Sequence, residues 1–67
     1  MSIAKQVTKE YKGQIGMMYS YTVTHATKEI VMAFKGNKTY PMYKFEDGST
    51  IEFEMKFGTV HKAKVLN

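Results

Sequence analysis

Few side chains in this sequence have the type and spacing that catalysis requires. Glu52 and Glu54 are two positions apart, so on a strand they would share one face, as an acid–base pair must. A solvated strand face that nearby lysines balance in charge explains the same pattern. There is no cysteine, and none of the three serines stands in a nucleophile-elbow motif. We therefore expect that the protein is not an enzyme.

The two histidines offer little to a metal ion. Zinc sites need three or four ligands, commonly with two of them close in sequence, and neither His25 nor His61 has such a neighbour. We expect an ordinary turn histidine at position 25 and a partly buried strand histidine at position 61. The sequence predicts no metal and no cofactor.

A G-x-x-G pattern spans Gly13 to Gly16. In one class of nucleic-acid-binding domain, such a segment joins two helices and clamps the nucleic-acid backbone. Here it would precede a strand, so we interpret it as the end of a helix and the entry to a strand.

The charge balance points to a polyanionic partner. The formal net charge is +4 and the pI is near 9.4, and such basic domains commonly bind nucleic acid. All ten basic residues are lysines. Arginine supplies the planar fork that reads guanine, so its absence argues against base-specific recognition. A low-GC genome, such as that of a bacteriophage, would also enrich lysine over arginine without functional meaning.

Six residues form the candidate partner surface on the outer face of the predicted sheet. They are Lys35, Lys38, Tyr40, Met42, Lys44 and Lys56. Lysines beside an exposed aromatic ring suit nucleic acid, since one stacked base contributes about 1–3 kcal/mol. Glu46, Glu52 and Glu54 would lie on the same side, so four lysines against three glutamates leave a charge of only about +1. We predict weak nucleic-acid binding that does not read sequence.

A protein partner explains the same surface equally well. Val31, Ala33, Tyr40 and Met42 would form a small apolar patch rimmed by charges of both signs, as many protein interfaces do. The protein would then be an inhibitor or adaptor of a larger complex, or a small structural subunit. Its size and lysine bias suit a phage-encoded modulator of a host process. A strand edge at residues 14–24 or at the C-terminus would allow a homodimer.

The first element that positions these residues is a short N-terminal helix over residues 2–12. Ser2 can cap it, and Gly13 stands where it would end. Apolar side chains recur there every four positions, at Ile3, Val7 and Tyr11. The same residues also fit a strand, because several of them are good strand formers.

Residues 14–24 alternate cleanly, which predicts a half-buried strand. The odd positions from Ile15 to Val23 are apolar and would share one face. Glycine, serine and threonine occupy the other face, with Met18 as the lone apolar exception.

Turn residues delimit three further strands. Residues 28–35 and 38–45 flank Gly36-Asn37, a pair suited to a two-residue hairpin, and residues 46–48 suit a three-residue loop with Gly48 in the left-handed conformation. These loops let the middle strand pair on both sides without a bulge. One face then carries the expected core, which is Ile30, Met32, Phe34, Pro41, Tyr43, Phe45, Ile51, Phe53, Met55 and Phe57. Pro41 lacks an amide donor, so we expect a bend or a local loss of pairing beside it.

Residues 59–66 fit a last strand, with His61, Ala63 and Val65 inward and Lys62 and Lys64 outward. Five antiparallel strands and a short N-terminal helix predict a mainly β (β-rich α+β) fold. We expect a five-stranded antiparallel sheet rolled into a small SH3-like or OB-like barrel, with residues 1–67 as a single domain.

Neither a signal peptide nor a membrane span is predicted. The N-terminal segment lacks the apolar core of a signal peptide. The longest apolar run, Ile30 to Phe34, is far shorter than a membrane span of about 20 residues. We therefore expect a cytoplasmic location and no membrane partner.

Overall fold

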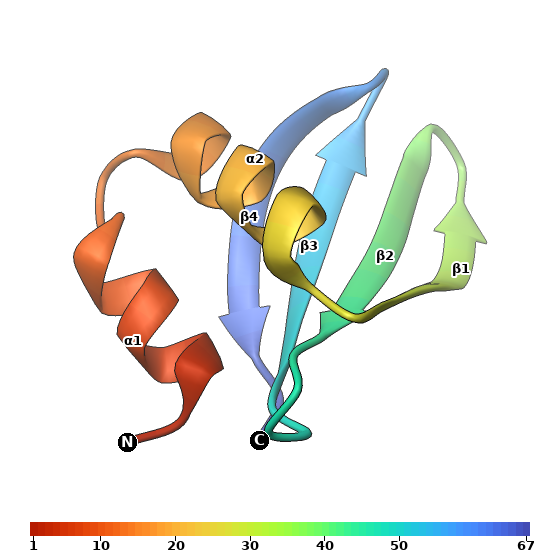
Figure 1. Ribbon diagram of the computed structural model, residues 1–67. Coiled ribbons are helices and arrows are strands. Elements are labelled where there is room, and N and C mark those ends of the chain that lie inside the picture. Colours follow the sequence, from red (N-terminus) through yellow and green to blue (C-terminus); the bar gives the residue numbers. More distant parts are fainter.

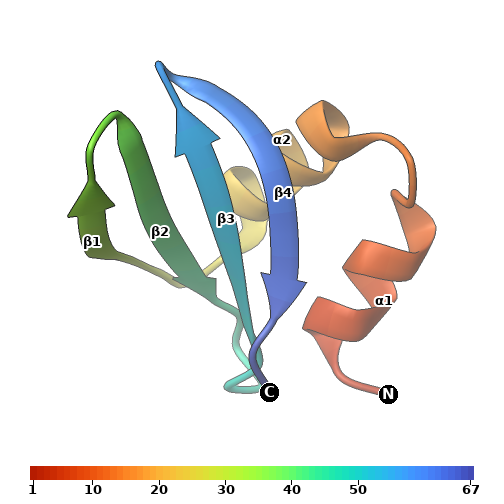
Figure 2. The same ribbon diagram turned by 180° about the vertical axis from the view of Figure 1, so that it is seen from behind.

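The computed structural model describes residues 1–67 and contains two helices followed by four strands (Figure 1). The helices are α1 (Ile3–Glu10) and α2 (Ile15–His25), and the strands are β1 (Lys28–Lys35), β2 (Lys38–Lys44), β3 (Thr50–Lys56) and β4 (Thr59–Val65). The strands form one antiparallel sheet in the order β1-β2-β3-β4. Helix α2 crosses one face of this sheet and α1 lies beside β4, while the opposite face carries no helix (Figures 1 and 2).

The expected five-stranded barrel is wrong. The sheet has four strands, it stays open, and β1 and β4 are its two edges. The missing strand is the segment 14–24, which forms α2 instead. A sheet of four short strands cannot close on itself, so a helix covers one face in place of a further strand.

Helix α2 packs through a stripe of residues with helical spacing. Met18 and Thr22 are buried, and Ile15 and Tyr19 pack against the core beside them. Met17, which the alternating pattern placed inward, is 59 % exposed. This segment contains no lysine, aspartate or glutamate that would show which side faces solvent. The two-residue repeat of a strand and the 3.6-residue repeat of a helix therefore both fit its sequence. Met18, the exception to the alternation, is the residue that indicates the helix.

Helix α1 and its Ser2 cap are confirmed, but the helix is two residues shorter at its C-terminal end than predicted. The Lys5 amide donates a hydrogen bond to Ser2 Oγ at 3.2 Å, so Ser2 caps the helix as predicted. The helix ends at Glu10, and Gly13 follows in a turn with φ of +81°. Ala4 and Val7 are its buried residues.

The loop between β2 and β3 supplies two further caps to α1. The Ile3 amide donates to Asp47 Oδ2 at 2.8 Å, and the Ala4 amide donates to Ser49 Oγ at 3.0 Å. The first amides of a helix have no partner within the helix. One loop therefore satisfies two of them and ties α1 to the sheet.

Both predicted hairpin turns are confirmed. Lys35 pairs with Lys38 around the first turn. In the second turn, the Phe45 amide donates to the Ser49 carbonyl at 2.8 Å, and Gly48 has a φ of +86°. That left-handed conformation is open to glycine without a steric cost, which is why the three-residue loop needs glycine there.

Seven residues form the apolar core between the helices and the sheet, namely Ala4, Val7, Met18, Tyr43, Phe45, Ile51 and Phe53. The fully buried Phe53 ring packs edge-on against Tyr19 of α2, with ring centroids 5.1 Å apart. The Tyr43 hydroxyl lies 3.2 Å from the Tyr19 hydroxyl and donates to Glu29 Oε2 at 2.9 Å. Burial, together with these hydrogen bonds, raises the pKa of Tyr43, so its hydroxyl remains a donor.

An unexpected bulge changes the faces of β1. The pairing of β1 with β2 shifts by one residue between Val31 and Phe34. A shift of one residue turns side chains to the other face of the sheet. Val31, paired with Pro41, therefore lies on the helix-bearing face, and Ile30, paired with Met42, lies on the helix-free face. The expectation of a register without a bulge was wrong.

Pro41 interrupts the pairing of β2 with β3, as predicted. Thr39 and Met42 each pair with a residue of β3, but Tyr40 and Pro41 between them do not. Because proline has no amide hydrogen, Pro41 cannot donate a backbone hydrogen bond to β3.

Several residues expected in the interior are exposed. Met32 and Phe34 on β1 and Phe57 in the β3–β4 turn lie at the surface. A second bulge, in the pairing of β3 with β4, leaves His61 exposed rather than partly buried. The physical reason is that one helix of 11 residues covers only part of an open sheet, whereas a closed barrel would have enclosed these side chains.

The helical packing of α2 predicts that alanine substitution at two neighbouring methionines will change the stability by very different amounts. Met18→Ala should lower the free energy of unfolding by about 2–5 kcal/mol, because it leaves a cavity in the core. Met17→Ala should change it by less than about 0.5 kcal/mol. Urea denaturation followed by circular dichroism, at low protein concentration, measures both. The reverse order of effects would mean that residues 14–24 form the alternating strand.

The cap at Asp47 predicts a stability that falls in acid. Hydrogen bonds from the Ile3 amide and then from Ser49 hold the pKa of the Asp47 carboxyl below its usual value. Its contribution is therefore complete above the unfolded-state pKa of about 3.9 and is lost as the pH falls through the lower folded-state pKa. Asp47→Ala should lower the melting temperature near neutral pH, and its difference from wild type should narrow in acid.

Thermal denaturation in steps of pH measures this difference. Glu46→Ala is the matched control, because Glu46 is an acidic neighbour in the same loop that lies outside the cap. A difference for Asp47→Ala that stayed constant at every pH would show that the carboxylate charge does not hold α1.

Candidate nucleic-acid interface

The helix-free face of the sheet carries seven of the ten lysines, and Figure 2 views the molecule from this side. Alternation along the strands and pairing between them place these seven together. They are Lys28, Lys35, Lys38, Lys44, Lys56, Lys62 and Lys64. Each is exposed or half-buried. We call this surface the lysine face.

Two rows of like charge cross the lysine face. Lys38 pairs with Lys35 on one side and with Lys56 on the other, so three lysines stand side by side on adjacent strands. At the other end of β2, Lys28 pairs with Lys44. Neighbouring strands are about 4.8 Å apart, and like charges directly opposite each other destabilise a sheet. Folding alone therefore does not explain these rows.

An apolar centre separates the two rows. Ile30 pairs with Met42, and Tyr40 lies two residues further along β2 on the same face. All three side chains are half-buried, so each still exposes part of its surface. A partner that touches both lysine rows must therefore cover Tyr40 and Met42 as well.

On the β4 side of this centre, charges of opposite sign meet. Glu52 pairs with Lys64, and Glu54 pairs with Lys62. Together with Tyr40, these four residues line a shallow depression of about 120 Å³. The two glutamates thus balance two lysines of β4 and leave both lysine rows uncompensated.

The lysine face holds more than the whole net charge of the protein. Seven lysines against two glutamates give it +5, while the remaining three lysines and four carboxylates give −1. The sequence pattern placed Glu46 on this surface and left out Lys28, Lys62 and Lys64, and it therefore predicted only about +1. Glu46 instead lies on the helix side, where it lines a depression with Ile3 and Tyr21.

The structure brings all six residues of the predicted partner surface together on the lysine face. The positions of Lys35, Lys38, Tyr40, Met42, Lys44 and Lys56 follow from the strand pairing. The apolar patch expected for a protein partner is changed, however. Val31 points to the other face and Ala33 lies within the bulge, so Ile30 replaces them beside Met42.

Sequence reasoning left three lysines out of this surface. Lys28 belongs to the predicted strand 28–35, and Lys62 and Lys64 were expected to point outward from the last strand. Lys28 shares its face with Ile30, so it reaches this surface only because of the bulge in β1. For Lys62 and Lys64, the order of the strands was missing, which places β4 beside β3. Consecutive hairpins usually lie side by side, and that rule would have joined the two lysines of β4 to the others.

The histidines and carboxylates of the chain do not gather into one cluster. No three His, Asp or Glu side chains lie close enough together to hold a metal ion. His25 lies in the last turn of α2 rather than in a loop, and its ring stacks on Tyr21 with centroids 4.0 Å apart. Glu52 and Glu54 each pair with a lysine of β4, as in a charge-balanced strand face.

The segment from Gly13 to Gly16 joins two helices, so its interpretation as a strand entry was wrong. Lys12 is the one lysine next to it. The segment also lies at the helices, away from the lysine face (Figure 1). A four-residue pattern with one positive charge does not by itself make a nucleic-acid site.

Comparisons with known proteins add no further constraint. No protein family, characterised protein or solved structure matches this chain. Neither helix combines the length and the apolar character that crossing a membrane would require. The function is therefore inferred from the lysine face itself.

The row of three lysines predicts that its middle member costs stability. Lys38→Gln should raise the free energy of unfolding by about 0.5 kcal/mol at low salt, because it removes a like charge between two others. In about 1 M salt the gain should vanish, since the Debye length shortens to about 3 Å. Urea denaturation at the two salt concentrations measures both values.

Lys62→Gln is the matched control for this experiment. Lys62 stands opposite Glu54, so its replacement should leave stability unchanged or lower it slightly. If the two variants changed the free energy of unfolding equally, the lysine row would not be a source of electrostatic repulsion in the folded protein.

Proposed function

We propose that the protein is a non-catalytic binding module whose lysine face binds single-stranded nucleic acid without reading its sequence. One observation carries this proposal, which is the row formed by Lys35, Lys38 and Lys56 on adjacent strands. Such a row costs the free protein stability. A phosphate backbone laid across it relieves the repulsion and releases condensed counterions, and that release drives binding.

The spacing of the two lysine rows suits an extended chain. Lys44 is six positions after Lys38 along β2, which is roughly 20 Å at 3.3 Å per residue. A nucleic-acid strand that contacts both rows passes over the apolar centre between them. Tyr40 belongs to this centre and is half-buried, so its ring can stack on a base of that strand, which contributes about 1–3 kcal/mol.

The residue types favour single strands and sequence-independent contacts. Duplex reading requires a helix or a two-stranded ribbon in the major groove, whereas the lysine face is one side of a four-stranded sheet. Lysine contacts phosphate as a point charge and lacks the planar fork with which arginine reads guanine. One aromatic ring stacks on any base, so it adds affinity without choosing among bases.

The proposal predicts two kinds of variant that behave differently with salt. Lys38→Glu combined with Lys44→Glu should weaken binding to a labelled single-stranded oligonucleotide at least tenfold at about 50 mM salt, and should make the salt slope shallower by about 1.4. Tyr40→Ala should weaken binding by about 5- to 150-fold while the salt slope stays unchanged. Fluorescence anisotropy at several salt concentrations measures both quantities.

Lys5→Glu combined with Lys9→Glu is the matched control. It makes the same change of charge at two exposed positions of α1, away from the lysine face. If this control weakens binding as much as the Lys38 and Lys44 pair, net charge rather than the lysine face attracts the ligand. Failure of the wild-type protein to bind at low salt would overturn the proposal and favour a protein partner on the same surface.

A further inference from the structure

Helix α2 is a surface helix without a lysine, aspartate or glutamate. From Gly13 to Thr27 the chain contains none of these residues, although they make up 24 % of the whole protein. A surface helix normally carries charged or polar residues on its solvent side, opposite its apolar side. Helix α2 is buried only where Met18 and Thr22 face the core, and its outward side meets solvent.

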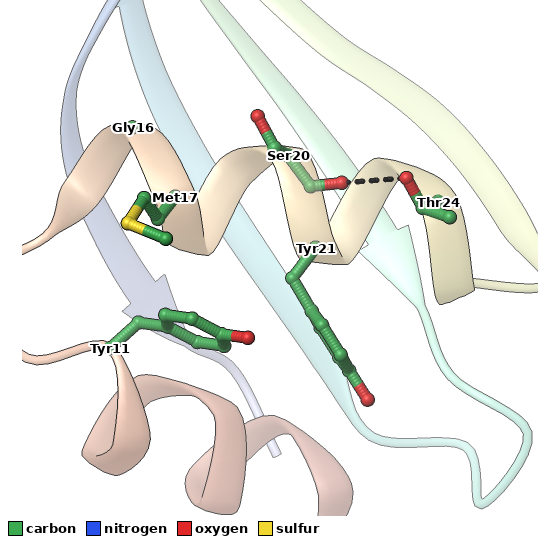
Figure 3. A pocket seen from close by; sticks show the side chains of 6 residues that line it. All are labelled: Tyr11, Gly16, Met17, Ser20, Tyr21 and Thr24. Carbon is green, nitrogen blue, oxygen red and sulfur yellow. Dashed lines mark hydrogen bonds between the residues drawn. The ribbon is translucent and has the colours of Figure 1, made fainter.

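The outward side of α2 borders a shallow, open groove of about 560 Å³ (Figure 3). Six residues line it, namely Tyr11 from the end of α1 and Gly16, Met17, Ser20, Tyr21 and Thr24 from α2. The rings of Tyr11 and Tyr21 lie 5.5 Å apart between centroids, and Met17 is largely exposed. The groove therefore combines apolar and aromatic surface with small side chains.

The small residues of this groove allow another helix to come close. Gly16, Ser20 and Thr24 recur every four residues, so they follow one side of α2. The Thr24 hydroxyl donates to the Ser20 carbonyl at 2.9 Å, so this polar group needs no outside partner (Figure 3). Gly16 has no side chain, and no atom lies within 4 Å of the position that a Cβ would take.

The distribution of charge indicates which kind of partner can bind the outward side of α2. Two copies of the protein, each with a net charge of +4, repel one another where their lysines meet. The outward side of α2 is uncharged and lies on the opposite side of the sheet from the lysine face (Figures 1 and 2). Two copies can therefore approach through α2 with their lysine faces farthest apart. A polyanion, in contrast, finds no cation along α2.

The small size of the core also favours association of two copies. Only 11 of the 67 residues are buried, and exposed apolar side chains remain on α2. Chains of this length bury a limited share of their surface, and oligomerisation is one common way to bury more.

We propose that the protein forms a homodimer through the outward side of α2, about a two-fold axis near Ser20. A two-fold contact pairs the same surface of both copies, with the two helices antiparallel. Gly16 of one protomer, which has no side chain, then faces Thr24 of the partner subunit. The Thr24 hydroxyl already donates a hydrogen bond within its own helix, so it needs no partner across the contact. The two lysine faces point away from each other, and this arrangement holds whatever the lysine face binds.

Sedimentation velocity of the full chain, without nucleic acid, tests the dimer. Helix α2 is about 16 Å long, so the contact is smaller than the standard of about 800 Å² per partner and should be reversible. Over about 5 to 500 µM, the range of a weak interface, the mass should rise from 7.7 kDa toward twice that value. A mass that stays at 7.7 kDa throughout would overturn the proposal.

Gly16→Lys is the variant that should abolish the dimer. It places a positive charge on each side of the contact, and a Cβ at this position meets no atom within 4 Å in the monomer. Lysine favours a helix more than glycine does, which offsets the unfavourable positive charge in the first turn of α2. Its melting temperature in dilute solution should therefore stay close to that of the wild type. Thr59→Lys is the matched control for dimerisation, because it adds the same charge at an exposed position of β4 and should leave dimerisation unchanged. Its melting temperature is not compared, because residue 59 stands opposite Lys56 and a lysine there adds a like charge to the row.

A cross-link tests the position of the axis. The chain has no cysteine, so Ser20→Cys introduces a single thiol. With a mild copper oxidant, two such thiols each lose a proton and an electron to form one disulfide, which requires Cα atoms within about 7 Å. We expect a covalent dimer from Ser20→Cys and none from Thr59→Cys. A dimer that survives Gly16→Lys, or that Ser20→Cys does not link, would place the contact elsewhere and overturn the proposal.

Discussion

The contact on which the rest of the structure depends joins the β2–β3 loop to the first turn of α1. Helix α1 has eight residues, too few to be stable alone, and no acidic residue in its own first turn. Asp47 and Ser49 accept hydrogen bonds from Ile3 and Ala4, which lie 44 and 45 positions away in the sequence. A carboxylate is also the charge that a helix N-terminus favours. Because the same loop closes a hairpin, the helix and the sheet stabilise each other.

This attachment gives the two sides of the sheet different roles. With α1 held beside β4, the short connection leads α2 across one face, where Met18 and Tyr19 meet the buried core around Phe53. The helices therefore cover only that face of the sheet. Side chains alternate along each strand, so the opposite side receives the polar positions, and seven lysines gather there. The separation of an apolar layer from a cationic face is the physical basis of the proposed function.

Two irregularities in the sheet determine which residues share the lysine face. The bulge in β1 moves Ile30 to that face and turns Val31 to the other, which also brings Glu29 within 2.9 Å of the buried Tyr43 hydroxyl. Around Pro41, two residues of β2 have no partner in β3. The bulge also bends and twists β1, which is an edge strand, and a twisted edge is less able to pair with other chains.

The sequence by itself determined the elements whose signals lie between near neighbours. The Ser2 cap, the turn at Gly36-Asn37, the loop at Gly48 and the break at Pro41 are all where the residue types predict them, because each depends on the conformation of a few consecutive residues. Only the tertiary structure decided that residues 14–24 are a helix, that β1 contains a bulge and that the sheet stays open. It also decided that the lysines of β4 join those of β2. These features depend on which distant surfaces bury one another, and a segment without charged residues satisfies the strand period and the helix period equally well until packing chooses between them.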